Sequence, residues 1–293
     1  MTLSVRFYKK LILLVLLLAI LIPTGLSIHY GIKSRTLGKR LEAAGLTSNG
    51  EPAQSSGLDL QGEAIDYQLL YPALYGTAGL DDERVLAKDT VYLTFDCAPS
   101  SNTMRILDIL DEYGVKATFF LMGTDDQEAP EVMSQITSRG HAIGLYSYSG
   151  SYPEIYDSVA SYLADFEKIY NWVYENTGVR AEIFRFPGGS VNSYNSNIYR
   201  ELVGEMIRRN FIFFDWNHSG GDNGSTADEI KSNVFATALG AERAIISLND
   251  MVRSEAVADA LPDIIGGLRD QGYSFQPLAA NVMPVIFSYK STP

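Results

Sequence analysis

The feature that most constrains the fold of this chain is a regular alternation of short apolar segments with amphipathic ones, which begins near Arg84. The apolar segments read TVYLTF, KATFFLMG, HAIGLYSYS, AEIFRFPGG, FIFFDWN, AIISLND and YSFQPL. Short connections between alternating strands and helices require parallel strands with helices outside them. We therefore predict an α/β fold, an irregular (β/α) barrel of about seven parallel strands rather than the regular eight.

Unusual polar or small residues follow five of the predicted strands. They are Asp96-Cys97, Tyr146 to Gly150, Arg185 to Gly189, Asp215-Trp216 with Asp222, and Asn249-Asp250. In barrels of parallel strands the chemistry gathers at the carboxyl ends of the strands. All five clusters should therefore lie on the same rim and form one groove.

The N-terminus carries three basic residues followed by an uncharged apolar run over residues 11–28. At about 1.5 Å rise per residue this run is near the lower limit for crossing a bilayer. No Ala-x-Ala site follows it, so we expect an uncleaved anchor over residues 1–32; a cleaved signal peptide is the alternative. The rest of the chain would then be extracytoplasmic at the cell membrane, or secreted after cleavage.

Between the apolar run and the barrel, residues 33–84 contain Gly, Ser, Asn and Pro with weak periodicity, which predicts a spacer. The tyrosine-rich DYQLLYPALYG within it should dock on the domain of residues 85–293, because so much aromatic surface gains by burial. The net charge of -12 and pI of about 4.7 argue against a nucleic-acid partner. The only cysteine, Cys97, excludes an intrachain disulfide.

From about residue 90 to residue 285 the clusters resemble the polysaccharide deacetylases that share the NodB homology domain (carbohydrate esterase family 4). YLTFDCAPS is similar to TFDDGPS, GHAIGLYSYSG to GHEIGNHTYSH, FRFPGGS to FRxPxG, FDWNHSGGD to a W-x-x-D-x-x-D segment, and IISLNDM to a leucine-x-His-Asp segment. The resemblance implies removal of acetyl groups from N-acetylglucosamine units of chitin or peptidoglycan. It also implies a divalent metal held by one Asp and two His, with an Asp base and a His acid.

The resemblance assigns these roles to residues of this chain, and most of them have changed. The base falls on Asp96, the metal aspartate on Cys97, the two metal histidines on Tyr146 and Gly150, and the acid on Asn249. Glycine offers no ligand, tyrosine binds metal only as phenolate, and asparagine delivers no proton. Cysteine is a competent zinc ligand, but a single thiolate does not replace three ligands. We therefore expect no resident metal unless zinc or another divalent ion uses a remodelled site.

The other roles fall on residues that are partly retained. The arginine that orients the base falls on Arg185, and the acidic pair after the tryptophan falls on Ser219 and Asp222. Residues at substrate-binding positions are Pro187, Gly188, Trp216, Tyr146 and Leu248. Asp96 and Arg185 can be retained as a buried ion pair for folding or as groups that still bind sugar, and both explanations stay open.

The three histidines of the chain are the candidates to replace the missing groups. His29 lies in the apolar N-terminal segment, and His141 begins a strand as an ordinary packed or surface histidine. His218 should face the rim, which makes it the candidate for a substitute ligand or acid. A Cys97 nucleophile would need a neighbouring base to lower the pKa of its thiol, whereas the charge of Asp96 beside it raises that pKa. We therefore expect Cys97 to be a small buried side chain that fills the former metal cavity.

The prediction is a membrane-anchored member of this fold without its reaction, a pseudoenzyme that binds cell-wall or surface glycan through the groove or docks a protein partner there. The first alternative is an active deacetylase that uses remodelled ligands such as Cys97 and His218. The second is a scaffold for protein partners in which the groove plays no part.

Overall fold

The computed structural model describes residues 65–289, apart from residues 79–83, 223 and 252–254. The predicted membrane anchor and most of the spacer lie outside these residues. Within them, no helix has both the length and the apolar character needed to cross a bilayer. These residues belong to a compact unit that begins at residue 64.

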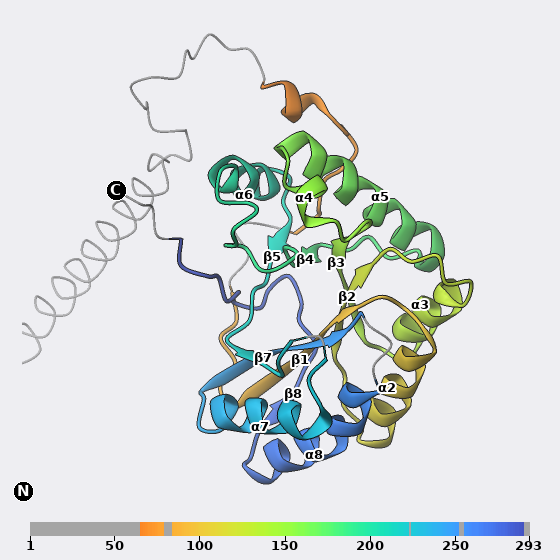
Figure 1. Cartoon of the computed structure of the whole chain (residues 1–293), viewed down its shortest axis with the longest axis vertical. Coiled ribbons are helices and arrows are strands. Elements are labelled where there is room, and N and C mark those ends of the chain that lie inside the picture. Colours follow the sequence, from red (N-terminus) through yellow and green to blue (C-terminus); the bar gives the residue numbers. More distant parts are fainter. Residues whose placement is uncertain (1–64, 79–83, 223, 252–254, 290–293) are drawn as a thin grey trace, which may run out of the picture. The chain divides into compact units, whose positions relative to one another are not determined.

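Strands and helices alternate along this unit much as the sequence predicts. The elements are η1 (Asp66–Leu69), β1 (Thr90–Cys97), α2 (Ser101–Glu112), β2 (Thr118–Met122), α3 (Ala129–Ser138), β3 (Ala142–Ser147), α4 (Tyr152–Ile155), α5 (Val159–Thr177), β4 (Ile183–Phe184), α6 (Tyr199–Arg208), β5 (Ile212–Phe213), β6 (His218–Ser219), α7 (Ala227–Ala238), β7 (Arg243–Asp250), α8 (Ala256–Asp270) and β8 (Ser274–Phe275). Figure 1 shows the helices on the outer side of the curved sheet.

The sheet is entirely parallel and follows the order β5-β4-β3-β2-β1-β7-β6, with β8 beside the start of β1. The prediction of seven parallel strands is confirmed. The prediction of a barrel needs correction, because the sheet curls into a half-barrel whose end strands are β5 and β6. These strands are only two residues long, so they offer little backbone for closing the sheet.

The C-terminal segment stands at the seam between these end strands. Val85 and Val282 form an isolated bridge near its start, and the Asp215 amide donates to the Val285 carbonyl at 2.9 Å. The Phe287 amide then donates to the Asp215 carboxylate at 2.6 Å. Residues 282–287 therefore connect two parts of the wall where the sheet itself is open.

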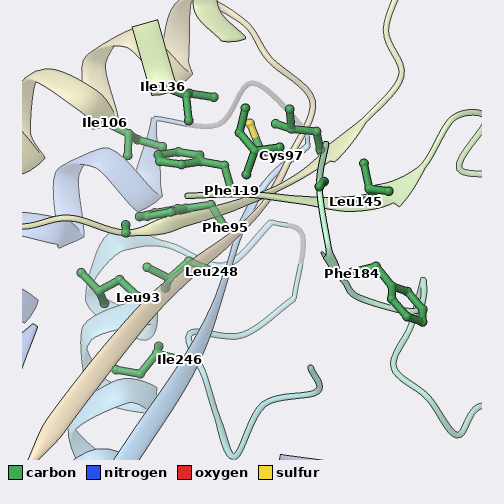
Figure 2. Packing of buried hydrophobic residues seen from close by; sticks show 14 of the residues in the cluster. Leu93, Phe95, Cys97, Ile106, Phe119, Ile136, Leu145, Phe184, Ile246 and Leu248 are labelled. Carbon is green, nitrogen blue, oxygen red and sulfur yellow. The ribbon is translucent and has the colours of Figure 1, made fainter. Parts of the chain in front are cut away.

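Alternate residues of the strands face two separate packing layers. The larger cluster fills the space between sheet and helices and includes Leu93, Phe95, Phe119 and Ile246, as Figure 2 shows. The smaller cluster fills the inside of the curl and contains Tyr92, Phe120, Tyr146, Phe214 and Ile245 among others. The side of the sheet that a residue faces thus follows from its place in the alternation.

The tyrosine-rich segment contacts α6 and its C-terminus. The fully buried Arg209 donates to the carbonyl oxygens of Tyr67, Leu70, Tyr71 and Leu74 at 2.7–3.4 Å. Its Nε donates to Glu205 at 2.6 Å. The rings of Tyr67 and Tyr71 pack against the helix-facing cluster. One arginine therefore satisfies backbone acceptors that the irregular segment cannot pair within itself.

Candidate functional site

Asp96 and Cys97 are neighbours in β1 but face opposite sides of the sheet. The Asp96 carboxylate lies on the inner side, where it accepts a hydrogen bond from Arg185, whereas Cys97 belongs to the helix-facing cluster. This separation follows from the period of two in a strand, because Cys97 is still part of β1. The candidate site therefore consists of inner residues at the carboxyl ends of the strands.

Arg185, at the end of β4, holds the Asp96 carboxylate. Its Nη1 lies 2.8 Å from Asp96 Oδ1 and 3.4 Å from the Ser247 hydroxyl, and its Nε donates to the Phe214 carbonyl at 3.0 Å. The arginine side chain is fully buried, and that of Asp96 is 9 % exposed. Residues from four strands or strand ends therefore meet around one buried ion pair.

Aromatic rings enclose the guanidinium group from two sides. Its central carbon lies 4.3 Å from the centre of the Phe120 ring and 5.2 Å from that of Trp216, distances typical of cation–π contacts. Burial raises the pKa of Asp96 above its ordinary value, and the charge of Arg185 opposes that rise. The carboxylate is thus held in place by a fixed cation in a poorly hydrated setting.

Gly150 provides no ligand, and its surroundings are closed to one. Its φ of 67° lies in the left-handed region, and a Cβ added there would meet the Met122 sulfur at 2.7 Å. A histidine at this position would therefore need Met122 to move. Met122 belongs to none of the family motifs, although its place at the end of KATFFLMG puts it on the same rim.

Tyr146 is held in its protonated form by the residues around it. Its hydroxyl lies 3.0 Å from that of Tyr152 and accepts a bond from the Gly188 amide at 3.3 Å. Burial, followed by the charge of Asp96, raises the pKa of Tyr146 far above its ordinary value. A phenolate ligand is therefore strongly disfavoured at this position.

Cys97 is buried, as predicted, but it fills space on the helix side rather than beside Tyr146. Its sulfur lies 3.5 Å from the Thr103 hydroxyl and 3.4 Å from the Asp250 carboxylate. Burial raises the pKa of Cys97 well above its ordinary value, and Asp250 adds to the shift more than Asp96 does. The thiol is therefore a poor metal ligand and a poor nucleophile in this state.

Asp250 is a second buried carboxylate, at the end of β7. Oδ1 accepts from Asn102 Nδ2 at 2.6 Å, and Oδ2 accepts from the Thr103 hydroxyl at 2.6 Å. Both donors belong to the first turn of α2. Burial raises the pKa of Asp250, and these hydrogen bonds oppose the rise. The cluster ties the start of α2 to the end of β7.

Asn249 and Leu248, two neighbouring residues of the predicted site, face opposite sides of the sheet. Asn249 pairs with Asp96 in register across β1 and β7, and its side-chain oxygen accepts the Met251 amide at 3.0 Å. Leu248 packs in the helix-facing cluster and is 2 % exposed. The inner neighbour of Arg185 in this strand is Ser247, because alternate residues face opposite sides.

The loop after β4 brings the substrate-binding positions close to further tyrosines. A Cβ at Gly188, whose φ is 76°, would meet the Tyr152 ring at 2.9 Å, and Tyr152 makes an edge contact with the exposed Tyr194. Pro187 is buried, and its carbonyl accepts from the Tyr156 hydroxyl at 2.8 Å. Sequence reasoning missed Tyr152 and Tyr194, although both follow strand ends within a few residues of the chosen motifs.

In the segment after β5, Asp215 and Trp216 contact other parts of the protein, whereas Asp222 is exposed. The buried Asp215 binds the backbone and hydroxyl of Ser190 and fixes Phe287, so it holds the loop and the C-terminal segment. Trp216 makes an edge contact with Phe287 at 4.9 Å between ring centres. Asp222 is exposed, and its backbone carbonyl accepts the Ser225 amide. Trp216 therefore contacts other residues of the predicted groove, whereas the described residues provide no hydrogen-bond partner for the Asp222 carboxylate.

The two described histidines lie apart from the Asp96 site. We expected His218 to face the rim, but it pairs with Ile246, a helix-facing residue, so it lies on the α7 side of the sheet. Burial lowers the pKa of His218. The nearby backbone of Arg243 opposes this shift, although it does not meet the geometry of a hydrogen bond to the ring. His141 is buried and accepts the Ala117 amide at 3.1 Å. Burial lowers the pKa of His141 to about 4.

The residues at the family's metal positions do not fit a metal ion. Cys97 faces the helices, the Tyr146 hydroxyl has other partners, and Met122 occupies the space that a side chain at Gly150 would need. Across the described ranges, no three His, Cys, Asp or Glu side chains gather in a group able to hold a metal ion. The site offers instead one buried ion pair with aromatic walls.

Comparison with known proteins gives the same family along three lines. The family model described as "Polysaccharide deacetylase" matches residues 83–206. A "Putative polysaccharide deacetylase YheN" of Bacillus subtilis (strain 168) is 28% identical over 209 residues, which cover 70% of this chain and 73% of that protein.

Solved structures share the fold over about two thirds or more of the chain. The catalytic domain of a peptidoglycan N-acetylglucosamine deacetylase from Eubacterium rectale is 30% identical with a TM-score of 0.68, covering 73% of this chain and 99% of that one. A mutant protein described as "a CE4 family pseudoenzyme with restored enzymatic activity" is 25% identical with a TM-score of 0.53. The match covers 65% of this chain and 66% of that one. The chain therefore belongs to the polysaccharide deacetylase family.

Proposed function

We propose that this protein binds an N-acetylglucosamine-containing glycan of the cell wall without hydrolysing it. We further propose that residues 11–28 anchor it in the cell membrane with the domain outside. Its relatives include a peptidoglycan N-acetylglucosamine deacetylase, which makes cell-wall glycan the ligand class to test first. The structural neighbour described as a pseudoenzyme provides a precedent for loss of activity within the family.

The observation that carries the loss of hydrolysis is the pair Gly150 and Met122. Glycine has no side chain that could bind a metal, and the Met122 sulfur lies 2.7 Å from the place of a Cβ at residue 150, so a ligand side chain there needs Met122 to move first. Cys97 and Tyr146 add to this, because burial raises the pKa of both and disfavours the anionic forms that bind metal.

The observation that favours sugar binding is the ion pair with its aromatic surroundings. Asp96 keeps a small exposed area, and a carboxylate fixed by arginine is a strong acceptor for sugar hydroxyl groups. Tyr152, Tyr194 and Trp216 provide ring faces and edges near Gly188 and Arg185. Aromatic rings with a few fixed polar groups are what binding sites for small organic ligands require.

Metal binding provides the sharpest test of this proposal. We expect full-length protein incubated with zinc and desalted to retain close to no metal, while an active family member retains about one equivalent. The variant Cys97→Asp/Tyr146→His/Gly150→His should retain no metal either, because position 97 faces the helices and Met122 stands beside position 150. One equivalent in the unmodified protein, lost in Cys97→Ser, would instead establish a remodelled metal site and make acetate release the next assay.

Glycan binding is tested by titration with N-acetylglucosamine oligomers followed by calorimetry. We expect Tyr194→Ala to weaken binding about tenfold, or about 1.4 kcal/mol. Tyr174→Ala is the matched control, because Tyr174 is a similarly exposed tyrosine on α5 that packs with Arg180. Absence of binding at millimolar oligomer would contradict the glycan proposal and favour a scaffold for protein partners.

A further inference from the structure

A hollow of about 450 Å³ opens beside Trp216 and β6, the end strand at the seam of the half-barrel. It is lined by the segment that joins β5 to β6, by β6 itself, by α7 and by Phe287 of the C-terminal segment. Its volume is in the range of about 300–1,000 Å³ that is usual for small-ligand sites. The motif FDWNHSGGD supplies Trp216, His218 and Ser219 to this hollow, whereas its walls from α7 and Phe287 lie outside the family motifs.

The lining residues define the class of ligand. The nine described residues around the hollow include no Asp, Glu, Lys or Arg, in a protein whose net charge is -12. Trp216 and Phe287 supply aromatic rings, while Asn233 and Thr237 supply an amide and a hydroxyl from exposed positions of α7. Aromatic surface with uncharged donors and acceptors suits a neutral, hydroxyl-rich ring and offers no partner to a charged one.

His218 adds an observation that itself points to a missing partner. Its ring lines the hollow, yet neither Nδ1 nor Nε2 has a hydrogen-bond partner among the described residues. Both nitrogens are screened from solvent, and a buried polar group without a hydrogen-bond partner lowers the stability of the folded chain. A turn of the ring toward a ligand hydroxyl would provide the missing hydrogen bond.

We propose that this hollow is a second saccharide subsite, which takes a neutral sugar unit of the same glycan chain whose neighbouring unit lies at Asp96 and Gly188. This inference rests on the proposed glycan binding. Trp216 connects the two places, because its ring lies 5.2 Å from the Arg185 guanidinium carbon and also lines the hollow. The two places are therefore next to one another, as neighbouring units of one sugar chain require.

Tryptophan fluorescence gives a direct readout of this subsite in the full-length protein. The chain has two tryptophans, Trp172 and Trp216, so Trp172→Phe leaves emission from Trp216 alone. In that background we would titrate acetylated chitohexaose into Ala236→Phe, which fills the hollow from an exposed position of α7. Ser232→Phe is the matched control, because Ser232 is exposed on the same helix and does not line the hollow.

The expected result is that Ala236→Phe and Tyr194→Ala each weaken binding about tenfold while Ser232→Phe leaves it unchanged. If Tyr194→Ala weakens binding and Ala236→Phe matches its control, the second subsite is refuted and groove binding stands. If Ala236→Phe alone weakens binding, the hollow binds sugar and the groove does not. If no variant and no parent protein binds, both proposals are refuted.

A second readout concerns His218 directly. The chain has three histidines, so ¹⁵N labelling of histidine gives ring signals that single substitutions assign, with His141 as an internal reference. Saturating oligomer should shift the His218 ring nitrogens and leave those of His141 in place. Unchanged His218 signals in a protein that binds the oligomer would overturn the role given to the imidazole.

Discussion

Two buried carboxylates, Asp96 and Asp250, stand at the ends of adjacent strands on opposite sides of the same sheet. Asp96 faces the inner side and is paired with the charged, fully buried Arg185. Asp250 faces the helices and accepts hydrogen bonds from the neutral side chains of Asn102 and Thr103. They lie one register position apart, since Asp96 pairs with Asn249 and Cys97 with Asp250.

The difference between the two carboxylates shows how an altered site can remain a folded one. On the inner side the base position and its arginine remain, with aromatic walls around them. On the helix side the first metal position has become the thiol of Cys97, which packs against Asp250 and Thr103. Loss of metal ligands is thus compatible with a rim in which both buried carboxylates keep hydrogen-bond partners.

The largest expected effect comes from Asp96→Asn, which leaves Arg185 buried without a counter-ion. Arginine cannot deprotonate to escape this cost, so we expect a loss of about 3–5 kcal/mol in the free energy of unfolding. Denaturant titration measures it. Asp96→Asn/Arg185→Met should recover much of the stability, and a double variant as unstable as the single one would show that the charge is not the cause.

Asp250→Asn should cost less, about 1–3 kcal/mol, because its partners are neutral. An amide offers one acceptor oxygen where the carboxylate offers two, so either Asn102 or Thr103 loses its partner. The same denaturant titration measures the loss. Thr103→Val/Asp250→Asn should cost less than the sum of its single variants, whereas simple additivity would mean that the hydrogen bond contributes nothing.

The pH dependence separates the Asp250 cluster from the rest of the protein. Burial raises the pKa of Asp250 in the folded chain above the value of 3.8 expected when unfolded. The folded state therefore takes up this proton first, and its contribution to stability grows as pH falls and is lost as pH rises through the raised pKa. The stability advantage over Asp250→Asn should increase from pH 7 toward pH 4; a constant difference would contradict the shift.

Reactivity of Cys97 is the smallest effect and tests the helix side alone. Because burial raises the pKa of its thiol, we expect a thiol reagent at pH 8 to label Cys97 only when the protein opens. Labelling should speed up in step with destabilisation by Asp250→Asn. Fast labelling of the native protein would place the thiol nearer to solvent than the structure does.

The alternation of segments was enough to predict the parallel strands, and the strand-end clusters were enough to place Asp96, Tyr146, Arg185 and Asn249 at one rim. Their backbone positions follow from periodicity alone. The environment of each side chain did not follow, because it depends on contacts between segments far apart in the sequence. The position of Met122 beside Gly150 is such a contact.

The errors concern short elements and the direction of side chains. β6 is two residues long and pairs with β7, so His218 turns to the α7 side, which its place in a predicted rim loop did not reveal. The open seam was missed for a related reason. A segment such as residues 282–287 has no strand or helix periodicity, and it takes its place through hydrogen bonds to Asp215.

The hydrogen bonds that Arg209 donates to residues 67–74 have a mechanical consequence. Its guanidinium group joins four carbonyl oxygens of residues 67–74 to the end of α6, next to the edge strand β5. A pull on the chain at residue 65 would load these hydrogen bonds before it reached the sheet. Force applied from the N-terminal side should therefore release the tyrosine-rich segment at a lower tension than the one that opens the half-barrel, so the sheet and its site stay intact while the tether lengthens.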